Sequence, residues 1–329
     1  MTQLHLDIVT VRGEVVESRH RVHAAVVDAT GALRASAGDP MLETFWRSCA
    51  KPFQVMPLLR RGHFDALGWG VDELALACAS HGGEPEHIGV ARGMLESAGL
   101  EEGDLACGSH EPLSKRGARL AEREGAPLTR LHNNCSGKHV AMLALARGEG
   151  WPILGYEKRG HRVQEAGLTA VAEWSGVAAG SLRQAVDGCG VVTFGLPLTA
   201  MAMSFARLAR CAASGDEVPA RIVGAMRARP FLVGGTDRFD TVLAEETEGA
   251  LLAKVGAEGV HTVAVLGDGI ALAVKVEDGA TRAQHPAVLR ALQQLGVLGD
   301  DLSPRLASFL SHPLLNTRGE VVGVTRPAA

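Results

Sequence analysis

The sequence is poor in tyrosine and lysine, and it lacks a long apolar run. Tyr156 is the one tyrosine among 329 residues, so a mechanism that needs a catalytic tyrosine has a single candidate. No stretch approaches the roughly 20 apolar residues that cross a bilayer. The net charge is −4 without a basic block, which argues against nucleic acid as a ligand. We therefore expect no membrane and no nucleic-acid partner.

Several sequence motifs with known chemistry are also missing. The chain has no Cys-x-x-Cys, no Gly-x-Ser-x-Gly elbow and no His-Glu-x-x-His, which argues against zinc fingers, α/β-hydrolases and that class of metalloprotease. The first residues alternate polar and apolar types and do not resemble a secretory signal. Six cysteines in such a chain predict reduced thiols and a cytoplasmic location.

The scarcity of lysine directs attention to the lysines that are present. Lys and Arg together number 33, and only six of these are lysine. A lysine can lose its proton and then act as a base or a metal ligand, which an arginine cannot do. The lysines are Lys51, Lys115, Lys138, Lys158, Lys254 and Lys275.

Ser48 and Lys51 form a Ser-x-x-Lys pair within residues 47–54. Positions three apart share one face of a helix, so a neutral amine could take the serine proton and create a nucleophile. Pro52 is tolerated only in a first helical turn, which places Ser48 at the start of a predicted helix over 48–62. Chance alone gives about 0.3 such pairs in this composition, so a capping serine beside a surface lysine is the plain alternative.

The hydrophobic pattern predicts strands at both ends of the chain and helices between them. We therefore predict an α+β fold, with an antiparallel sheet flanked by helices and a helical subdomain. The expected organisation is one compact catalytic domain over 1–329, with a sheet region at about 1–47 and 250–329 and a helical region at about 48–249. The predicted strands are 3–10, 20–28, 32–37, 251–255, 260–266, 270–277 and 319–325, and the main predicted helices are 72–79, 85–98, 115–124, 138–148, 160–175, 198–214, 216–229 and 285–296.

Free cysteines are often buried in apolar surroundings and inert. Cys135 and Cys189 instead lie in turns rich in glycine and asparagine. Such thiols could hold a metal together with His132 or His139, form a disulfide, or simply be buried. Asp187, in the turn that contains Cys189, could bind an amino group or cap the turn.

Ser48-x-x-Lys51, a later Ser80 and a late Lys254-Val255-Gly256 follow the order of motifs in enzymes of the penicillin-binding and β-lactamase type. Those enzymes carry Lys-Thr-Gly at the third motif. Because Val255 cannot hydrogen-bond a carboxylate, the sequence argues against recognition of a β-lactam.

Five motifs in order resemble the Rhizobium etli-type (class 3) L-asparaginases from about residue 8 to residue 280. The resemblance implies hydrolysis of L-asparagine to L-aspartate and ammonia, a fold similar to serine β-lactamases and glutaminases, and a homodimer. The motifs are Arg47-Ser48-Cys49-Ala50-Lys51-Pro52, Ser80-His81-Gly82-Gly83, Asn133-Asn134-Cys135-Ser136-Gly137-Lys138-His139, Asp187-Gly188-Cys189-Gly190 and Lys254-Val255-Gly256-Ala257-Glu258-Gly259.

The resemblance also implies roles for individual residues. Ser48 would be the nucleophile and Lys51 its base, while Ser80 and Lys254 would form a second Ser–Lys pair. A zinc ion would bind beside the pocket. Its ligands would be Cys135, Lys138 and Cys189, and the residues holding the amino-acid part of the substrate would be Arg47, His139 and Asp187.

The expected activity is that of an amidohydrolase acting on a linear amide, an L-asparaginase that forms an acyl-enzyme on Ser48. One alternative is a glutaminase or another small amidase. An alternative from a different class is a non-catalytic, metal-dependent binding protein in which Ser48 only caps a helix.

Overall fold

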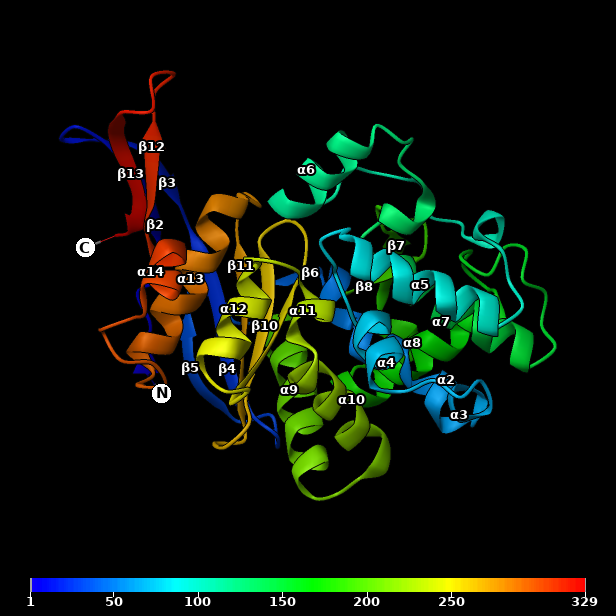
Figure 1. Cartoon of the computed structure of the whole chain (residues 1–329). Coiled ribbons are helices and arrows are strands. Elements are labelled where there is room, and N and C mark those ends of the chain that lie inside the picture. Colours follow the sequence, from blue (N-terminus) through cyan, green and yellow to red (C-terminus); the bar gives the residue numbers. More distant parts are fainter. Residues whose placement is uncertain (1, 329) are drawn as a thin grey trace. The chain divides into compact units, whose positions relative to one another are not determined.

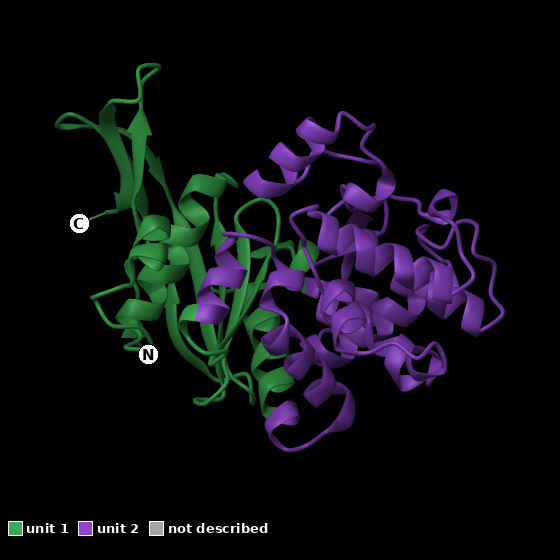
Figure 2. Cartoon of the chain, in the orientation of Figure 1, with its two compact units in different colours: residues 1–49, 196–210, 246–329 green, residues 50–195, 211–245 purple. Residues whose placement is uncertain are grey.

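The computed structural model describes residues 2–328, and the chain forms two compact units (Figure 2). The predicted sheet region lies in unit 1, and most of the predicted helical region lies in unit 2. The parts of the predicted helical region that belong to unit 1 are residues 48–49, 196–210 and 246–249. That the chain is a single catalytic domain stays a prediction. Unit 1 comprises residues 1–49, 196–210 and 246–329, and unit 2 comprises residues 50–195 and 211–245.

Unit 1 contains a six-stranded sheet in the order β1-β5-β4-β11-β10-β9. Neighbouring strands are antiparallel, except that β1 and β5 are parallel. The central strands β4 and β11 are almost wholly buried runs of valine and alanine, which explains why they lie in the middle of the sheet. The strands are β1 (Thr2–Gln3), β4 (Val22–Asp28), β5 (Leu33–Ala37), β9 (Leu251–Val255), β10 (Val260–Val265) and β11 (Ile270–Val276).

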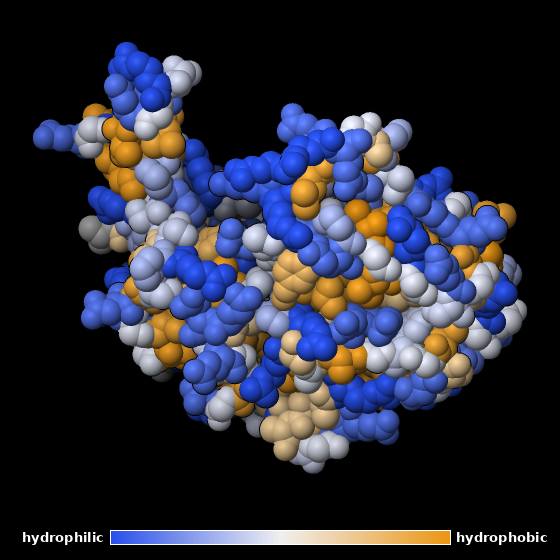
Figure 3. Space-filling view, in the orientation of Figure 1, coloured by the Kyte–Doolittle hydropathy of each residue, from blue (hydrophilic) through white to orange (hydrophobic). Residues whose placement is uncertain are grey.

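The strands predicted at the two ends of the chain do pair, but they divide between two sheets. The second sheet of unit 1 is antiparallel, in the order β12-β13-β2-β3. The prediction of one sheet was wrong because the chain leaves the second sheet at Arg21, between β3 and β4. Apolar residues lie on the surface of this sheet (Figures 1 and 3). Its strands are β2 (Ile8–Arg12), β3 (Val15–His20), β12 (His312–Leu315) and β13 (Val321–Pro327).

Helix α13 (Thr281–Gln294) packs against β11 and β13 through an alanine- and leucine-rich face, and α14 (Pro304–Leu310) packs against α13. The part of α9 (Leu198–Ala213) within unit 1 brings Phe205 against Trp46. Trp46 follows β6 (Glu43–Phe45) and is fully buried. The predicted class, antiparallel sheet with helices and a helical region, is confirmed.

Unit 2 is mainly helical and is built around α7 (Ser136–Gly148). Residues 136–146 of this helix are all buried, which is expected of a helix surrounded by other elements. It packs against α2, α4, α5 and α8. The other helices with most residues in unit 2 are α1 (Lys51–Gln54), α2 (Met56–Arg60), α3 (His63–Ala66), α4 (Val71–Ala77), α5 (Pro85–Ser97), α6 (Lys115–Glu124), α8 (Arg162–Ser175), α10 (Glu217–Ala228), α11 (Pro230–Val233) and α12 (Phe239–Glu246), and its strands are β7 (Arg183–Val186) and β8 (Val192–Pro197).

The helix predicted over 48–62 is divided in the structure. A 3₁₀ turn, η1 (Arg47–Ala50), leads into α1, and α2 begins after Val55. Pro52 lies in the first turn of α1, as predicted, and Pro57 lies in the first turn of α2. A proline has no N–H to continue a helix, so the second proline explains the break. No helix within residues 2–328 is both long and apolar enough to cross a membrane.

Candidate active site

Ser48 lies in η1, half-buried, directly after a residue with unusual backbone geometry. Arg47 has a φ of 53°, in the left-handed region that costs free energy for any residue with a Cβ. Such conformations persist where the surrounding structure enforces them, and they cluster at functional sites. The backbone before the predicted nucleophile is therefore held in a strained conformation.

The segment after Ser48 packs against the strand that carries Lys254. The Cys49 thiol donates a hydrogen bond to the Lys254 carbonyl oxygen at 2.9 Å. A Cβ on Gly256 would lie 3.1 Å from Cys49 Sγ and 3.2 Å from the Trp46 carbonyl oxygen. The glycine of the predicted Lys254-Val255-Gly256 motif thus allows η1 and β9 to approach each other within unit 1.

Lys254 itself is fully buried on β9. Its Nζ donates to the Val255 carbonyl oxygen at 2.9 Å. Because Ser80 belongs to unit 2 and Lys254 to unit 1, their predicted pairing stays a prediction. The same holds for Ser48 and Lys51, since the boundary between the units falls between Cys49 and Ala50.

Lys51 opens α1 and is also fully buried. Within unit 2 its Nζ lies 3.1 Å from Ser80 Oγ, and it donates to the carbonyl oxygens of Ala79 and, at 3.3 Å, Asn134. Ser80 follows α4, and its own N–H donates to the Val233 carbonyl oxygen at 3.0 Å. The serine that the structure places beside Lys51 in this unit is therefore Ser80.

The three partners of Lys51 match its hydrogen-bonding capacity. Two partners of Lys51 are carbonyl oxygens, which can only accept, and the third is a hydroxyl, which can donate or accept. A charged Lys51 satisfies all three partners with its three N–H groups. A neutral Lys51 satisfies the carbonyls with two N–H groups and accepts the Ser80 proton on its lone pair. Proton transfer between Lys51 and Ser80 would leave every partner satisfied.

The histidine after Ser80 has a structural role. His81 is fully buried, its Nδ1 accepts from the Gly83 N–H at 3.1 Å, and its Nε2 lies 2.9 Å from Ser136 Oγ. Burial and then the neighbouring His87 hold the pKa of His81 well below its usual range. A neutral His81 with Nδ1 engaged in this way donates from Nε2 to Ser136. Both ring nitrogens are therefore engaged in hydrogen bonds. The lone pair of Nδ1 accepts from Gly83, so the His81 ring has no free nitrogen to act as a base.

His139 is fully buried on α7 with one nitrogen engaged. Its Nδ1 lies 2.5 Å from the Tyr156 hydroxyl, which also accepts from the Ala106 N–H at 3.0 Å. His139 Nε2 has no hydrogen-bond partner among the described residues. Burial, followed by the charge of Lys138, lowers the pKa of His139 to about 3. A buried polar nitrogen of this kind is suited to a ligand. The substrate-binding role of His139 stays a prediction.

Tyr156 is the one tyrosine of the sequence, and no sequence pattern predicts that it belongs to the site. It comes from the segment between α7 and α8 and is almost completely buried. Its hydroxyl sets the orientation of the His139 ring. The lone tyrosine was the one available signal, because nothing in the local pattern relates residue 156 to residue 139.

Cys135, Lys138 and Cys189 come together within unit 2. Cys135 precedes α7, Lys138 is in its first turn, and Cys189 lies in the turn between β7 and β8. Lys138 Nζ donates to Cys189 Sγ at 3.0 Å. Asp187 lies beside them, with Oδ2 at 4.0 Å from Cys189 Sγ and Oδ1 accepting from the Gly188 N–H.

The two thiols have opposite protonation preferences. A hydrogen bond from Cys135 lowers the pKa of Cys189 to about 5, against the effect of burial and with the help of Lys138. The same hydrogen bond, together with burial, raises the pKa of Cys135 to about 12. Burial favours a neutral Lys138, but the charges at Cys189 and Cys135 raise the pKa of Lys138 above its usual value. These directions favour a thiolate at Cys189 beside an ammonium at Lys138.

The donor atoms of this set fit zinc. Thiolate sulfur and nitrogen are the donors that Zn²⁺ prefers, and an ammonium that loses its proton to solvent becomes such a nitrogen donor. Within residues 2–328 no group of three or more His, Cys, Asp or Glu side chains is placed to hold a metal ion. The third donor near the two cysteines is instead the amine of Lys138.

The comparisons with known proteins extend over nearly the whole chain. The solved structure of Mglu in its native form is 16% identical over 86% of this chain and 67% of Mglu, with a TM-score of 0.44. A beta-lactamase (Mb2281c) from Mycobacterium bovis is 14% identical over 84% of this chain and 96% of its own, with a TM-score of 0.43. No curated protein matches the sequence.

The family comparison covers every residue predicted for the site. Residues 8–327 match the L-asparaginase II family. The resemblance seen in the sequence motifs is thereby confirmed, and with it the general class of amidohydrolase acting on a small-molecule amide. This chain belongs to the L-asparaginase II family.

Proposed function

We propose that this protein hydrolyses the side-chain amide of L-asparagine, giving L-aspartate and ammonia, through an acyl-enzyme on Ser48. Membership of the L-asparaginase II family supports the activity in general. The single observation that carries the mechanism is the buried Lys51 amine with Ser80 Oγ at 3.1 Å and two carbonyl acceptors. That arrangement provides a base and a proton relay three residues from the proposed nucleophile.

In the proposed acylation step, Ser48 Oγ forms a bond to the amide carbon as its proton passes to neutral Lys51. Backbone N–H groups at the start of the helical segment, including that of Ser48, would stabilise the oxyanion. The C–N bond then breaks, and the departing nitrogen takes a proton through Ser80 and leaves as ammonia. Water attacks the ester by the reverse sequence, which releases aspartate and restores Ser48. Lys254 is proposed to act with Ser80 as a second pair.

Recognition of the amino-acid part needs groups of both charges. The α-carboxylate requires a cation, which Arg47 supplies, and the α-ammonium requires an anion, which Asp187 supplies. The unpartnered Nε2 of buried His139 adds a hydrogen-bonding group to that set. These assignments are supported by the sequence motifs and by the position of His139 one residue from Lys138.

We propose that Cys135, Lys138 and Cys189 bind Zn²⁺. When bound, the ion would supply a rigid pocket wall and a contact for substrate, since two thiolates and an amine leave it little net charge for strong Lewis-acid chemistry. A homodimer and a cytoplasmic location complete the proposal. They are supported by the family resemblance and by six cysteines that are all free thiols in the structure.

Ammonia release from asparagine and from glutamine, measured side by side, tests the proposal. Wild-type protein is expected to favour asparagine, Ser48→Ala to abolish release while remaining folded, and Ser308→Ala, at an exposed serine of α14, to behave as wild type. Preference for glutamine would establish a glutaminase instead. Release from neither amide, together with tight metal-dependent binding of an amino acid, would favour a binding protein in which Ser48 only caps a helix.

A further inference from the structure

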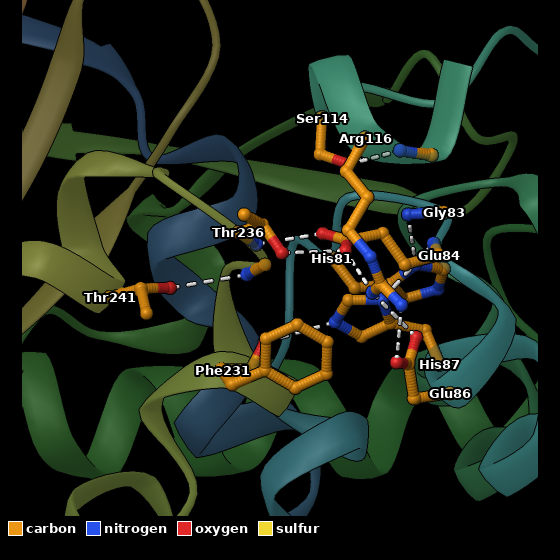
Figure 4. A network of polar contacts seen from close by, with 12 residues as sticks. His81, Gly83, Glu84, Glu86, His87, Ser114, Arg116, Phe231, Thr236 and Thr241 are labelled. Carbon is orange, nitrogen blue, oxygen red and sulfur yellow. Dashed lines mark hydrogen bonds and ion pairs between the residues drawn. The ribbon is translucent and has the colours of Figure 1, made fainter. Parts of the chain in front are cut away.

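A fully buried carboxylate, Glu84, lies four residues after Ser80. It accepts hydrogen bonds from Arg116 Nη1 at 2.6 Å and from the backbone N–H and hydroxyl of Thr236, each at 2.7 Å (Figure 4). Burying a charge without partners is costly, so a carboxylate with this many donors has a defined place in the fold. Burial alone would raise the pKa of Glu84, but Thr236, Arg116 and Ser114 lower it below its ordinary value.

The contacts of Glu84 connect the Ser80 loop to the turn at residues 234–241. The Ser80 N–H donates to the carbonyl oxygen of Val233, just before this turn, and Thr236 within the turn donates twice to Glu84. The turn is closed internally by Thr241, whose hydroxyl accepts from the Gly235 N–H at 3.1 Å. The loop and the turn are thus joined at both ends of residues 80–84.

Helix α6 holds the middle of the same loop. The Ser114 N–H donates to the Gly82 carbonyl oxygen at 3.1 Å, and Arg116, two residues later, binds Glu84. Arg116 also forms two hydrogen bonds with Glu86, at 2.7 and 2.9 Å, on the exposed side of the network. Glu84 and Glu86 therefore share one arginine, and of these two carboxylates it is Glu84 that binds Thr236 in the turn.

The glycines in this region leave no room for a side chain. Gly235 has a φ of +118°, and a Cβ there would lie 2.8 Å from Glu84 Oε1 and 3.3 Å from Gly82 Cα. A Cβ on Gly82 would lie 2.7 Å from Ser114 Cβ. The paired glycines at 82–83 and 234–235 are explained by this close approach of three segments.

We propose that Glu84 is a positioning residue: it holds the Ser80 loop against the 234–241 turn and so keeps Ser80 Oγ within hydrogen-bond distance of Lys51 Nζ. The catalytic consequence rests on the proposed role of Ser80 as a proton relay. A displacement of about 1 Å at a catalytic group can cost on the order of 10²-fold in rate. Glu84 therefore influences turnover without touching the substrate.

The test compares matched variants. Glu84→Gln keeps the shape and removes the charge, and it should lower kcat by about 10- to 100-fold with little change in KM. Glu86→Gln removes the exposed partner of the same arginine and should retain wild-type kcat. Thr236→Val should lower kcat less than Glu84→Gln, and Thr236→Ser, which keeps the hydroxyl, should restore it. Wild-type kcat in both Glu84→Gln and Thr236→Val would overturn the proposal.

A double-mutant cycle separates positioning from a general loss of stability. If Glu84 acts through Ser80, then adding Glu84→Gln to the Ser80→Ala variant should leave its residual turnover almost unchanged. A purely structural role would reduce turnover by the same factor in both backgrounds, which would contradict the proposal. Thr236→Val serves in the same cycle if Glu84→Gln fails to fold.

A crystal structure of Glu84→Gln, or of Thr236→Val, keeps this inference distinct from the proposed function. The distance from Lys51 Nζ to Ser80 Oγ should exceed hydrogen-bond range in the variant. An unchanged 3.1 Å contact would refute the positioning role. If Ser80→Ala itself keeps full turnover while the contact is lost in the variant, positioning by Glu84 stands and the relay role of Ser80 is wrong.

Discussion

Two buried lysines in unit 2 have sharply different surroundings. The hydrogen-bond partners of Lys51 among the described residues are two carbonyl oxygens and the hydroxyl of Ser80, all uncharged. Lys138 instead contacts the sulfur of Cys189, in a pocket that also contains Cys135. The difference explains why the two lysines are proposed for different roles: the partners of Lys51 carry no charge, whereas the pocket of Lys138 contains the sulfur atoms that suit a counter-ion or a metal.

Lys51→Arg should have the largest effect on activity. Arginine keeps the positive charge but cannot act as a base, so turnover should fall by on the order of 10²- to 10⁴-fold. Steady-state ammonia release measures the loss, and Lys158→Arg, at an exposed position, should remain at wild type. If the Lys51→Arg variant hydrolyses asparagine at the wild-type rate, Lys51 is not the base. The proposed functional difference between Lys51 and Lys138 would then be wrong.

Removal of the two proposed sulfur ligands tests the metal site around Lys138 and leaves the contacts of Lys51 in place. Cys135→Ser with Cys189→Ser is expected to abolish stoichiometric zinc in freshly purified protein, because two of the three proposed ligands lose their thiolates. Metal analysis by mass spectrometry gives the readout. Cys211→Ser, outside the cluster, should keep the wild-type metal content. Wild-type protein without bound zinc after purification with added zinc would contradict the proposed site.

Tyr156→Phe should have a moderate effect, seen in stability. The variant removes the hydroxyl that binds both the Ala106 N–H and His139 Nδ1. His139 is fully buried, and an unsatisfied buried group costs about 1–3 kcal/mol. Denaturant unfolding should therefore show a lower free energy of unfolding. Stability equal to wild type would mean that another group satisfies these atoms, and that His139 is not oriented by Tyr156.

The smallest expected effect is a dependence on pH in the Glu84 network. The pKa of Glu84 is lowered in the folded protein, so its charge stabilises the fold above the unfolded pKa, about 4.3, and this contribution is lost as pH falls through the folded pKa. The stability difference between wild type and Glu84→Gln should be complete at neutral pH and shrink in acid. Unfolding curves measured at several pH values test this, and a difference independent of pH would show that the charge has no such role.

The sequence predicted elements better than it predicted contacts. Local patterns identified β4, β9, β10 and β11 closely, because alternation and turn residues are local properties. The division into two sheets was not predictable, because no local pattern indicates that consecutive strands β3 and β4 belong to different sheets. Local spacing likewise linked Lys51 to Ser48, whereas its contact with Ser80 depends on how the start of α1 packs against the loop after α4.

The candidate site shows the same limit. Cys135, Lys138 and Cys189 could be grouped through the family resemblance, although Cys189 is 51 residues from Lys138, and the structure does bring them together. Glu84 is not among the residues that the sequence predicts for the site. Its importance comes from burial between Arg116 and Thr236, which no local pattern encodes.

The most direct test of the account is to quench the enzyme rapidly with asparagine and to examine its peptides by mass spectrometry. The account predicts one aspartyl group attached through an ester to Ser48 in the wild-type protein, and no such adduct in Ser48→Ala. An aspartyl ester on a different residue, or rapid ammonia release from Ser48→Ala, would contradict it.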